Sequence, residues 1–266
     1  MITEITSLEN SLIKHVKQLA KRKYRERHNQ YIIEGVRIVS DALENGQSME
    51  SILFCEELFQ TAGGEALFQQ LHKHGFKIYH ITNRLYGEIS ETESPQGIMA
   101  ILSKAQDDLA VLPLKDNGFY VLIDRVQDPG NMGTIIRTAD AAGADAIFVS
   151  KGTVDLYNPK TIRATMGSIF HVPILQIEDT QEILAFFRDR DIQIITTSLE
   201  GTHYHYEVDY KQSFVAIVGN EANGVSSLWL EQADLLVKIP LLGKAESLNA
   251  SIAAAIVFYE AVRQRN

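Results

Sequence analysis

The sequence predicts an α/β protein made of two α/β regions, and two observations lead to this prediction. Short apolar runs rich in β-forming residues alternate with segments of helical periodicity along most of the chain. In the second region the runs are continuously apolar, as in FYVLI and FVAIV. Such runs are typical of a mostly parallel sheet that is covered by helices on both faces.

The first region is expected to be a small α/β domain. Its predicted strands lie at 31–33, 51–55, 77–81 and 98–102, and its predicted helices lie around 36–44 and 65–74. Ahead of them, Leu8, Leu12, Val16 and Leu19 recur at helical spacing. A basic amphipathic helix followed by a basic turn is therefore expected near the N-terminus.

A polar stretch containing one proline and one glycine separates the two regions, and residues 105–117 are the predicted linker. The chain is thus expected to divide into a domain at 1–104 and a domain at 118–266. In the second domain, helical patterns fill the gaps between six predicted strands, at 119–124, 146–150, 172–177, 192–198, 214–218 and 235–239.

Composition excludes several classes of protein. The 266 residues are 45% hydrophobic and 22% charged, as in an ordinary globular chain. No apolar run approaches the ~18 residues that a membrane span needs, and the N-terminus lacks the apolar core of a signal peptide. Cys55 is the single cysteine, and His203 and His205 have no third candidate metal ligand at a spacing typical of a metal site. We therefore expect a cytoplasmic protein without a metal site.

The basic residues concentrate near the N-terminus, although the net charge is −9 and the isoelectric point is about 5.4. Seven of them fall within residues 14–27: Lys14, Lys17, Lys21, Arg22, Lys23, Arg25 and Arg27. The charge pattern alone leaves two interpretations, a solvated helix face or a contact for a polyanion.

Three Gly/Asn/Ser-rich turns follow predicted strands of the second domain: QDPGNMG, GNEANGVS and PLLGKAESLNAS. In an open parallel sheet, ligands bind beyond the carboxyl ends of the strands, which is where these turns are expected. None contains Gly-x-Gly-x-x-Gly, and Lys151 stands where a dinucleotide fold usually has an acidic residue. A nicotinamide-dependent dehydrogenase is therefore disfavoured.

These turns carry three ordered motifs. They are Asn131-x-Gly133-x-x-x-Arg137-x-Ala139, Gly219-x-Glu221-x-x-Gly224, and Ile239-Pro240 with Ser247-Leu248-Asn249. Together they resemble the SpoU branch of the SPOUT RNA methyltransferases. The first domain resembles the L30e-like substrate-binding domain often fused to it, through Glu34-Gly35 and the segment Ser94-Pro95-Gln96-Gly97-Ile98.

The resemblance implies methyl transfer from S-adenosylmethionine to a ribose 2′-hydroxyl of structured RNA. It also implies a deep trefoil knot in the second domain and a homodimer formed through that domain. The implied cofactor-binding residues are Ser198, Gly219, Asn220, Ile239, Leu241, Ser247 and Leu248. The implied catalytic residue is Arg137, as a base or as a charged clamp, with Asn131, Glu221 and Asn249 beside it.

Alternatives stay open for individual residues and for the whole chain. Asn249 and Ser247 also suit a helix cap, and Glu221 suits the first turn of a helix. Because of the N-terminal domain we expect a substrate in large-subunit ribosomal RNA, with the basic segment 14–27 as an RNA contact. A transfer RNA enzyme, a non-catalytic RNA-binding or ribosome assembly factor, and a nucleotide-binding metabolic enzyme are the other candidates.

Overall fold

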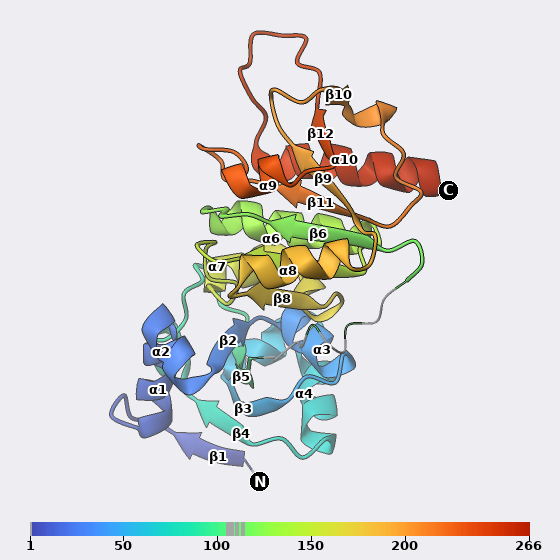
Figure 1. The fold of residues 1–266 in the computed structure, drawn as a ribbon. Helices are drawn as coiled ribbons and strands as arrows, with labels where there is room; N and C mark the ends of the chain where they lie inside the picture. Colours follow the sequence, from blue (N-terminus) through green and yellow to red (C-terminus); the bar gives the residue numbers. More distant parts are fainter. Residues whose placement is uncertain (1, 105–108, 110–111, 113–114) are drawn as a thin grey trace. The chain divides into compact units, whose positions relative to one another are not determined.

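The computed structural model describes residues 2–104, 109, 112 and 115–266, which form two compact units (Figure 1). The first unit comprises Met1–Ala105 and Tyr157–Phe170, and the second comprises Gln106–Leu156 and His171–Asn266. The predicted linker, 105–117, lies largely outside the described residues. The division into domains at 1–104 and 118–266 therefore stays a prediction.

The sheet of the first unit has the strand order β1-β4-β3-β5-β2. Strands β1, β4 and β3 run parallel, and β5 runs antiparallel to β3 and β2. The four expected strands are present. Strand β1 was not expected, because its sequence ITEI spans only four residues and two of them are polar. The strand bounds are β1 Ile2–Ile5, β2 Gln30–Glu34, β3 Met49–Phe54, β4 Ile78–Ile81 and β5 Ile98–Ser103.

Helix α1 begins at Ser11 because the side chain of Asn10 accepts a hydrogen bond from Leu12 N. Its buried residues Ile13, Val16 and Leu19 pack into the core of the unit. The segment expected as a basic turn is a second helix, α2. The helices of this unit are α1 Ser11–Leu19, α2 Arg22–His28, α3 Val36–Glu44, η1 Glu56–Gln60, α4 Gly64–Lys73, α5 Asn83–Gly87, α7 Pro159–Thr165 and η3 Ser168–Phe170.

The second unit contains the expected parallel sheet, with strand order β10-β12-β9-β11-β6-β7-β8 and parallel pairing throughout. The six expected strands are present, and the unexpected β10 spans only two residues at the edge of the sheet. The strand bounds are β6 Phe119–Ile123, β7 Ala146–Ser150, β8 Ile174–Ile177, β9 Gln193–Thr197, β10 His203–Tyr204, β11 Phe214–Val218 and β12 Leu235–Lys238.

Helices cover both faces of this sheet, as predicted (Figure 1). Tyr120 packs in one core cluster with Phe187 of α8 and Trp229 of α9. The adjacent Phe119 stacks on Phe214 and meets Phe258 of α10 on the other face, since successive strand residues point to opposite sides. The helices are α6 Pro129–Ala141, α8 Thr180–Arg188, η4 His205–Glu207, α9 Ser227–Glu231 and α10 Ala250–Arg265.

The trefoil knot implied by the resemblance stays a prediction. None of the helices that the structure describes combines the length and apolar character of a membrane crossing.

Candidate active site

A cavity of about 290 Å³ lies at the carboxyl ends of the parallel strands in the second unit. The ends of β9, β11 and β12 line it together with the beginning of α10. This is the edge of the sheet where the sequence places its three turns. The lining includes every residue that the resemblance implied for cofactor binding: Ser198, Gly219, Asn220, Ile239, Leu241, Ser247 and Leu248.

The turn after β11 is closed by its own hydrogen bonds. Asn220 and Gly224 exchange two backbone hydrogen bonds of 3.0 and 2.9 Å, and Gly224 has φ +66°. A Cβ on Gly219 would lie 2.3 Å from Val225 N, so only glycine permits this close approach. The Asn220 side chain accepts from two backbone N–H groups of its own turn and donates to Arg125 O at 2.8 Å. Asn220 therefore offers the cavity mainly its backbone.

Three predicted catalytic side chains form one hydrogen-bond network. Asn131 Nδ2 donates to Glu221 Oε1 at 2.9 Å, and Asn249 Nδ2 donates to Asn131 Oδ1 at 2.8 Å. These residues come from the beginning of α6, the turn after β11 and the beginning of α10. The structure thus brings together residues that are up to 118 positions apart in the sequence.

Glu221 also ties the turn after β11 to the beginning of α6. Its two carboxylate oxygens accept hydrogen bonds from Gln127 N and Asp128 N, both at 3.0 Å. Partial burial favours a higher pKa, but the bonds from Asn131, Gln127 and Asp128 stabilise the carboxylate, and the pKa of Glu221 is lowered overall. Glu221 is therefore a structural anion at neutral pH and not a proton donor.

Asn249 has two roles at once. Its side-chain oxygen caps α10 by accepting from Ser251 N at 2.9 Å and from Ile252 N, while its amide nitrogen holds Asn131. The helix cap and the network position are therefore compatible. Ser247 lines the cavity and is not the capping residue of α10.

Arg137 is exposed on α6 and is not part of the cavity lining. Within the described residues it makes neither a hydrogen bond nor an ion pair. No ion pair between Glu221 and Arg137 is present among the described residues. Glu221 binds Asn131 and backbone N–H groups, and the Arg137 guanidinium stays unpaired within the described part of the chain.

Two acidic residues at the site were not found by sequence reasoning. Glu246 lines the cavity together with Glu221, and none of the described lining residues is a lysine, arginine or histidine. Asp124, 2% exposed, accepts from Ser226 N at 2.7 Å and from Ser150 Oγ at 3.1 Å, and so joins the ends of β6 and β7 to the segment before α9. A single acidic residue after an apolar strand gave no signal in the sequence.

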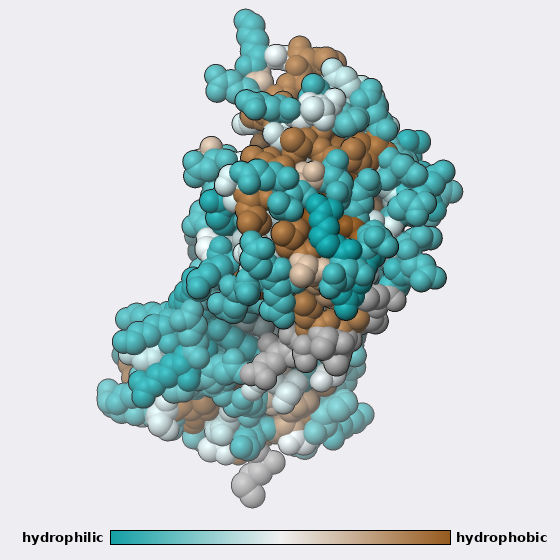
Figure 2. Space-filling view, in the orientation of Figure 1, coloured by the Kyte–Doolittle hydropathy of each residue, from teal (hydrophilic) through white to brown (hydrophobic). Residues whose placement is uncertain are grey.

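The predicted RNA-contact segment of the first unit keeps most of its basic residues on the surface. Figure 2 shows a largely hydrophilic surface over α1 and α2. Ion pairs of this segment include Lys14 with Glu9, Lys17 with Glu88 and Arg22 with Glu26. Lys21, Lys23 and Arg27 are exposed.

Arg25 is the exception, and its assignment to the RNA contact is wrong. Its side chain is 2% exposed and donates to Leu19 O at 2.8 Å and to Ala20 O at 2.7 Å. These are carbonyls at the end of α1 that no helical N–H can reach. Arg25 therefore joins α2 to α1 inside the unit, and charge counting could not distinguish it from its exposed neighbours.

No group of three or more His, Cys, Asp or Glu residues suited to a metal ion occurs in the part of the chain that the structure describes.

Comparison with known proteins identifies the family. Residues 118–259 match the SpoU rRNA methylase family, and residues 10–100 match the MRM3-like substrate-binding domain. The chain is 36% identical to the 23S rRNA (guanosine(2553)-2′-O)-methyltransferase RlmP of Bacillus subtilis, over 96% of this chain and 98% of the relative. It is 32% identical to the 23S rRNA (uridine(2479)-2′-O)-methyltransferase of Streptomyces viridochromogenes, over 93% and 87%.

Solved structures agree with these matches. The AdoMet-bound rRNA methyltransferase from Sinorhizobium meliloti superposes with a TM-score of 0.89 at 33% identity, covering 98% of each chain. The SpoU methyltransferase AviRb from Streptomyces viridochromogenes, in complex with AdoMet, superposes with a TM-score of 0.87 at 32% identity, covering 97% of this chain and 98% of its own. With a family match over more than half its length and full-length relatives above 30% identity, the chain belongs to the SpoU rRNA methylase family.

Proposed function

We propose that this protein is an S-adenosylmethionine-dependent methyltransferase that modifies a ribose 2′-hydroxyl of large-subunit ribosomal RNA. The observation that carries the proposal is the cavity lined by all seven predicted cofactor residues, beside the Asn131–Glu221–Asn249 network. The 23S rRNA methyltransferases among its relatives support the choice of RNA.

The charge of the cavity suits this cofactor. The lining residues that the structure describes include the carboxylates Glu221 and Glu246 and no basic side chain. A donor with a cationic sulfur is attracted by such a lining, whereas the phosphates of a dinucleotide would meet no cation there. Apolar side chains such as Ile239 and Leu248 can flank an adenine ring, and the backbone of the turn after β11 can hydrogen-bond to it. The acidic lining disfavours the nucleotide-binding metabolic alternative.

S-adenosylmethionine would supply a methyl group bound to a positively charged sulfur, and the protein's own residues would then position the acceptor. The Asn131–Glu221–Asn249 network holds the beginning of α6 against the cavity, which fixes the helix that carries Arg137. Alignment of the attacking oxygen is the main requirement of an in-line displacement. Apolar lining residues keep water from competing with the ribose hydroxyl.

We assign Arg137 the role of a charged clamp. A guanidinium keeps its charge at neutral pH, which makes it a poor base. A charged Arg137 can bind an RNA phosphate and stabilise negative charge that develops on the 2′-oxygen. Its exposure and its lack of a partner among the described residues support this role.

A homodimer is part of the proposal. Ile252 and Tyr259 of α10 are each 51% exposed and lie seven positions apart, so they share one face of the helix with the half-buried Ile256. A second copy of the chain can cover this apolar face. Light scattering of the wild type and of a Tyr259→Glu variant would test it, and a wild type that is monomeric at micromolar concentration would exclude the dimer.

The exposed residues Lys21, Lys23 and Arg27 support an RNA contact in the first unit. Reversing all three charges should weaken binding of a ribosomal RNA fragment and flatten its dependence on salt, without changing affinity for S-adenosylmethionine. An unchanged salt dependence would remove this segment from the interface. We propose the cytoplasm as the compartment, which the single Cys55 supports.

The decisive experiment measures transfer of a labelled methyl group to ribosomal RNA and to transfer RNA by the wild type and by Arg137→Ala. We expect the wild type to label the ribosomal RNA and Arg137→Ala to lose about 10²–10³-fold in rate. A map of 2′-O-methyl sites in wild-type and deletion cells would then locate the nucleotide. If the wild type binds cofactor and RNA but transfers no label, the chain is a non-catalytic RNA-binding or assembly factor.

A further inference from the structure

A second cavity, of about 330 Å³, lies within the first unit and has no part in the mechanism above. It is formed by the end of β2, the first turn of α3, the loop before β5 and the end of α7. All of its lining residues belong to the first unit. Arg37 of α3 and Arg163 of α7 are its two basic side chains.

Arg37 and Arg163 are exposed, and neither makes a hydrogen bond or an ion pair with any described residue. The one acidic residue of the lining is Glu34, whose Oε1 accepts hydrogen bonds from the hydroxyls of Tyr86, Ser90 and Thr92. The lining therefore has a net charge of +1, and its carboxylate is already engaged.

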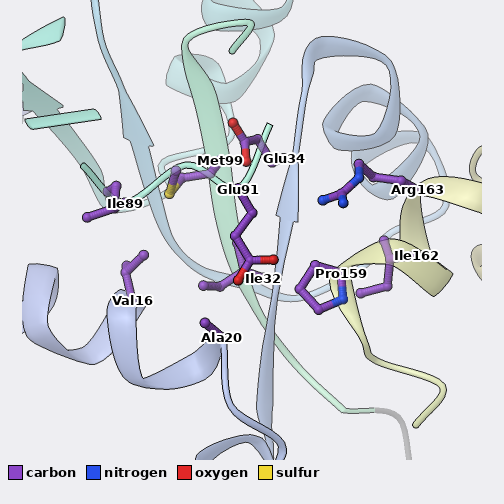
Figure 3. A pocket seen from close by; sticks show the side chains of 10 residues that line it. All are labelled: Val16, Ala20, Ile32, Glu34, Ile89, Glu91, Met99, Pro159, Ile162 and Arg163. Carbon is purple, nitrogen blue, oxygen red and sulfur yellow. The ribbon is translucent and has the colours of Figure 1, made fainter. Parts of the chain in front are cut away.

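Arg163 also borders a smaller neighbouring cavity, of about 30 Å³, that shares Glu34 with the larger one. Figure 3 shows the Arg163 guanidinium directed toward that space, where Glu34 and Glu91 also lie. No ion pair forms between Arg163 and either carboxylate. The guanidinium is thus held near two cavities without being neutralised.

The rest of the larger cavity combines apolar and polar groups. Ile38 is buried and Met166 is 39% exposed, so together they offer an apolar wall. Gln96 Oε1 accepts from Val36 N at 2.8 Å, which directs this side chain at the beginning of α3. Ser94 adds an exposed hydroxyl to the lining. A flat apolar ring with polar edges, attached to an anion, matches this set of groups.

We propose that this cavity binds one unstacked nucleotide of the substrate RNA. Arg37 and Arg163 hold its phosphate, and Ile38 and Met166 contact its base. Proteins recognise single-stranded RNA by this combination of guanidinium–phosphate pairs and contacts to a splayed-out base. The inference rests on the proposed function, because it assigns the first unit a specific subsite for the RNA that the second unit methylates.

The test compares Arg37→Ala, Arg163→Ala and the double variant with the wild type. The matched control is Arg84→Ala, because Arg84 is an exposed arginine of the same unit that lies outside the cavity lining. Fluorescence anisotropy with a ribosomal RNA fragment should show about tenfold weaker binding for each single variant and about 100-fold for the double variant. Each lost phosphate contact should lower the slope of log affinity against log salt by about 0.7.

Further readouts separate this role from a structural one. Affinity for S-adenosylmethionine, the melting temperature and kcat at saturating RNA should stay at wild-type values, while KM for RNA rises. Arg163→Lys keeps the charge and should retain the salt slope. Unchanged RNA affinity in the double variant overturns the proposal, as does a loss no larger than that of Arg84→Ala.

Adenosine monophosphate and guanosine monophosphate test whether the cavity binds a free mononucleotide instead of a nucleotide of RNA. If a free mononucleotide binds the wild type and not the double variant, while RNA affinity is equal in both, the cavity is a mononucleotide site and the RNA proposal is wrong. Failure of the proposed function looks different: the wild type would then transfer no methyl group to RNA, whatever the arginine variants bind.

Discussion

Replacing Glu221 by glutamine keeps the size of the side chain but changes its hydrogen-bonding groups. Oε2 accepts from Gln127 N, and Oε1 accepts from Asp128 N and Asn131 Nδ2. A glutamine has one oxygen and one NH₂ group in these two places. If the NH₂ replaces Oε2, one bond is lost, and if it replaces Oε1, two are lost. In either orientation an N–H group faces another donor.

The size of the effect follows from these bonds. A hydrogen bond to a charged acceptor contributes about 1.5–3 kcal/mol when shielded, and exposure of Glu221 to solvent lowers this to about 1 kcal/mol. The loss of one or two bonds should therefore cost about 1–2 kcal/mol, or about 2–8 °C in melting temperature for a unit of this size. Because the beginning of α6 would shift, methyl transfer should fall by about 10–100-fold.

Single-turnover methyl transfer and thermal unfolding would measure both effects. Glu231→Gln is the control, since Glu231 is an exposed carboxylate of the same unit with no hydrogen bond from its side chain among the described residues. Because the pKa of Glu221 is lowered in the folded protein, its stabilising effect is present above the ordinary value of 4.5 and lost as pH falls below it. The stability difference between wild type and Glu221→Gln should shrink accordingly. A variant that matches the control in rate and melting temperature would refute the reasoning.

Three further substitutions probe other parts of the molecule. Gly219→Ala should weaken S-adenosylmethionine binding by tenfold or more in calorimetry, because the added Cβ would lie 2.3 Å from a backbone nitrogen of the same turn. Unchanged affinity would show that the backbone of the turn can shift to accommodate the methyl group. Arg25→Ala should lower the free energy of unfolding, measured with urea, by about 2 kcal/mol, because Arg25 is buried and hydrogen-bonded to two carbonyls. Arg27→Ala is the control and should change the free energy of unfolding by less than about 0.5 kcal/mol. Equal effects of the two substitutions would contradict the burial of Arg25. The pKa of Glu260 is lowered to about 2, chiefly because its carboxylate is hydrogen-bonded to Arg263. Glu260→Gln should therefore remove stability that the wild type keeps above pH 4.5 and loses as pH falls toward 2. If the stability of the two proteins changes with pH in the same way, the Glu260–Arg263 pair is not the source of this stability.

The strands of the parallel sheet were predictable because apolar β-forming runs have few other uses in a globular chain. The strands that were not predicted, β1 and β10, have only four and two residues and form at sheet edges, where pairing depends on the neighbouring strand more than on their own sequence. The burial of the charged Arg25 side chain could not be predicted from the sequence either. Arg25 has exposed basic neighbours in the sequence, and only the position of the α1 carbonyls explains why it is inside.

The residues of the candidate site could be predicted from the sequence more readily than the hydrogen bonds between them. Sequence resemblance selected Asn131, Glu221 and Asn249, but their connection depends on how distant chain ends meet in space. Asp124 and Glu246 were missed because single acidic residues near turns are common and carry no pattern.

The Asn249 side chain makes hydrogen bonds both to the beginning of α10 and to Asn131, and this has a consequence for how the site can evolve. One amide both starts a helix of sixteen residues and holds Asn131, so a change at position 249 disturbs two structures that selection would otherwise adjust separately. Once one member of the triplet 131, 221 and 249 is replaced, each residue that was bonded to it has already lost that bond, and replacing that residue as well costs less than it would alone. Substitutions at these three positions should therefore be strongly non-additive in double-mutant cycles, and across related sequences the three should change together or not at all.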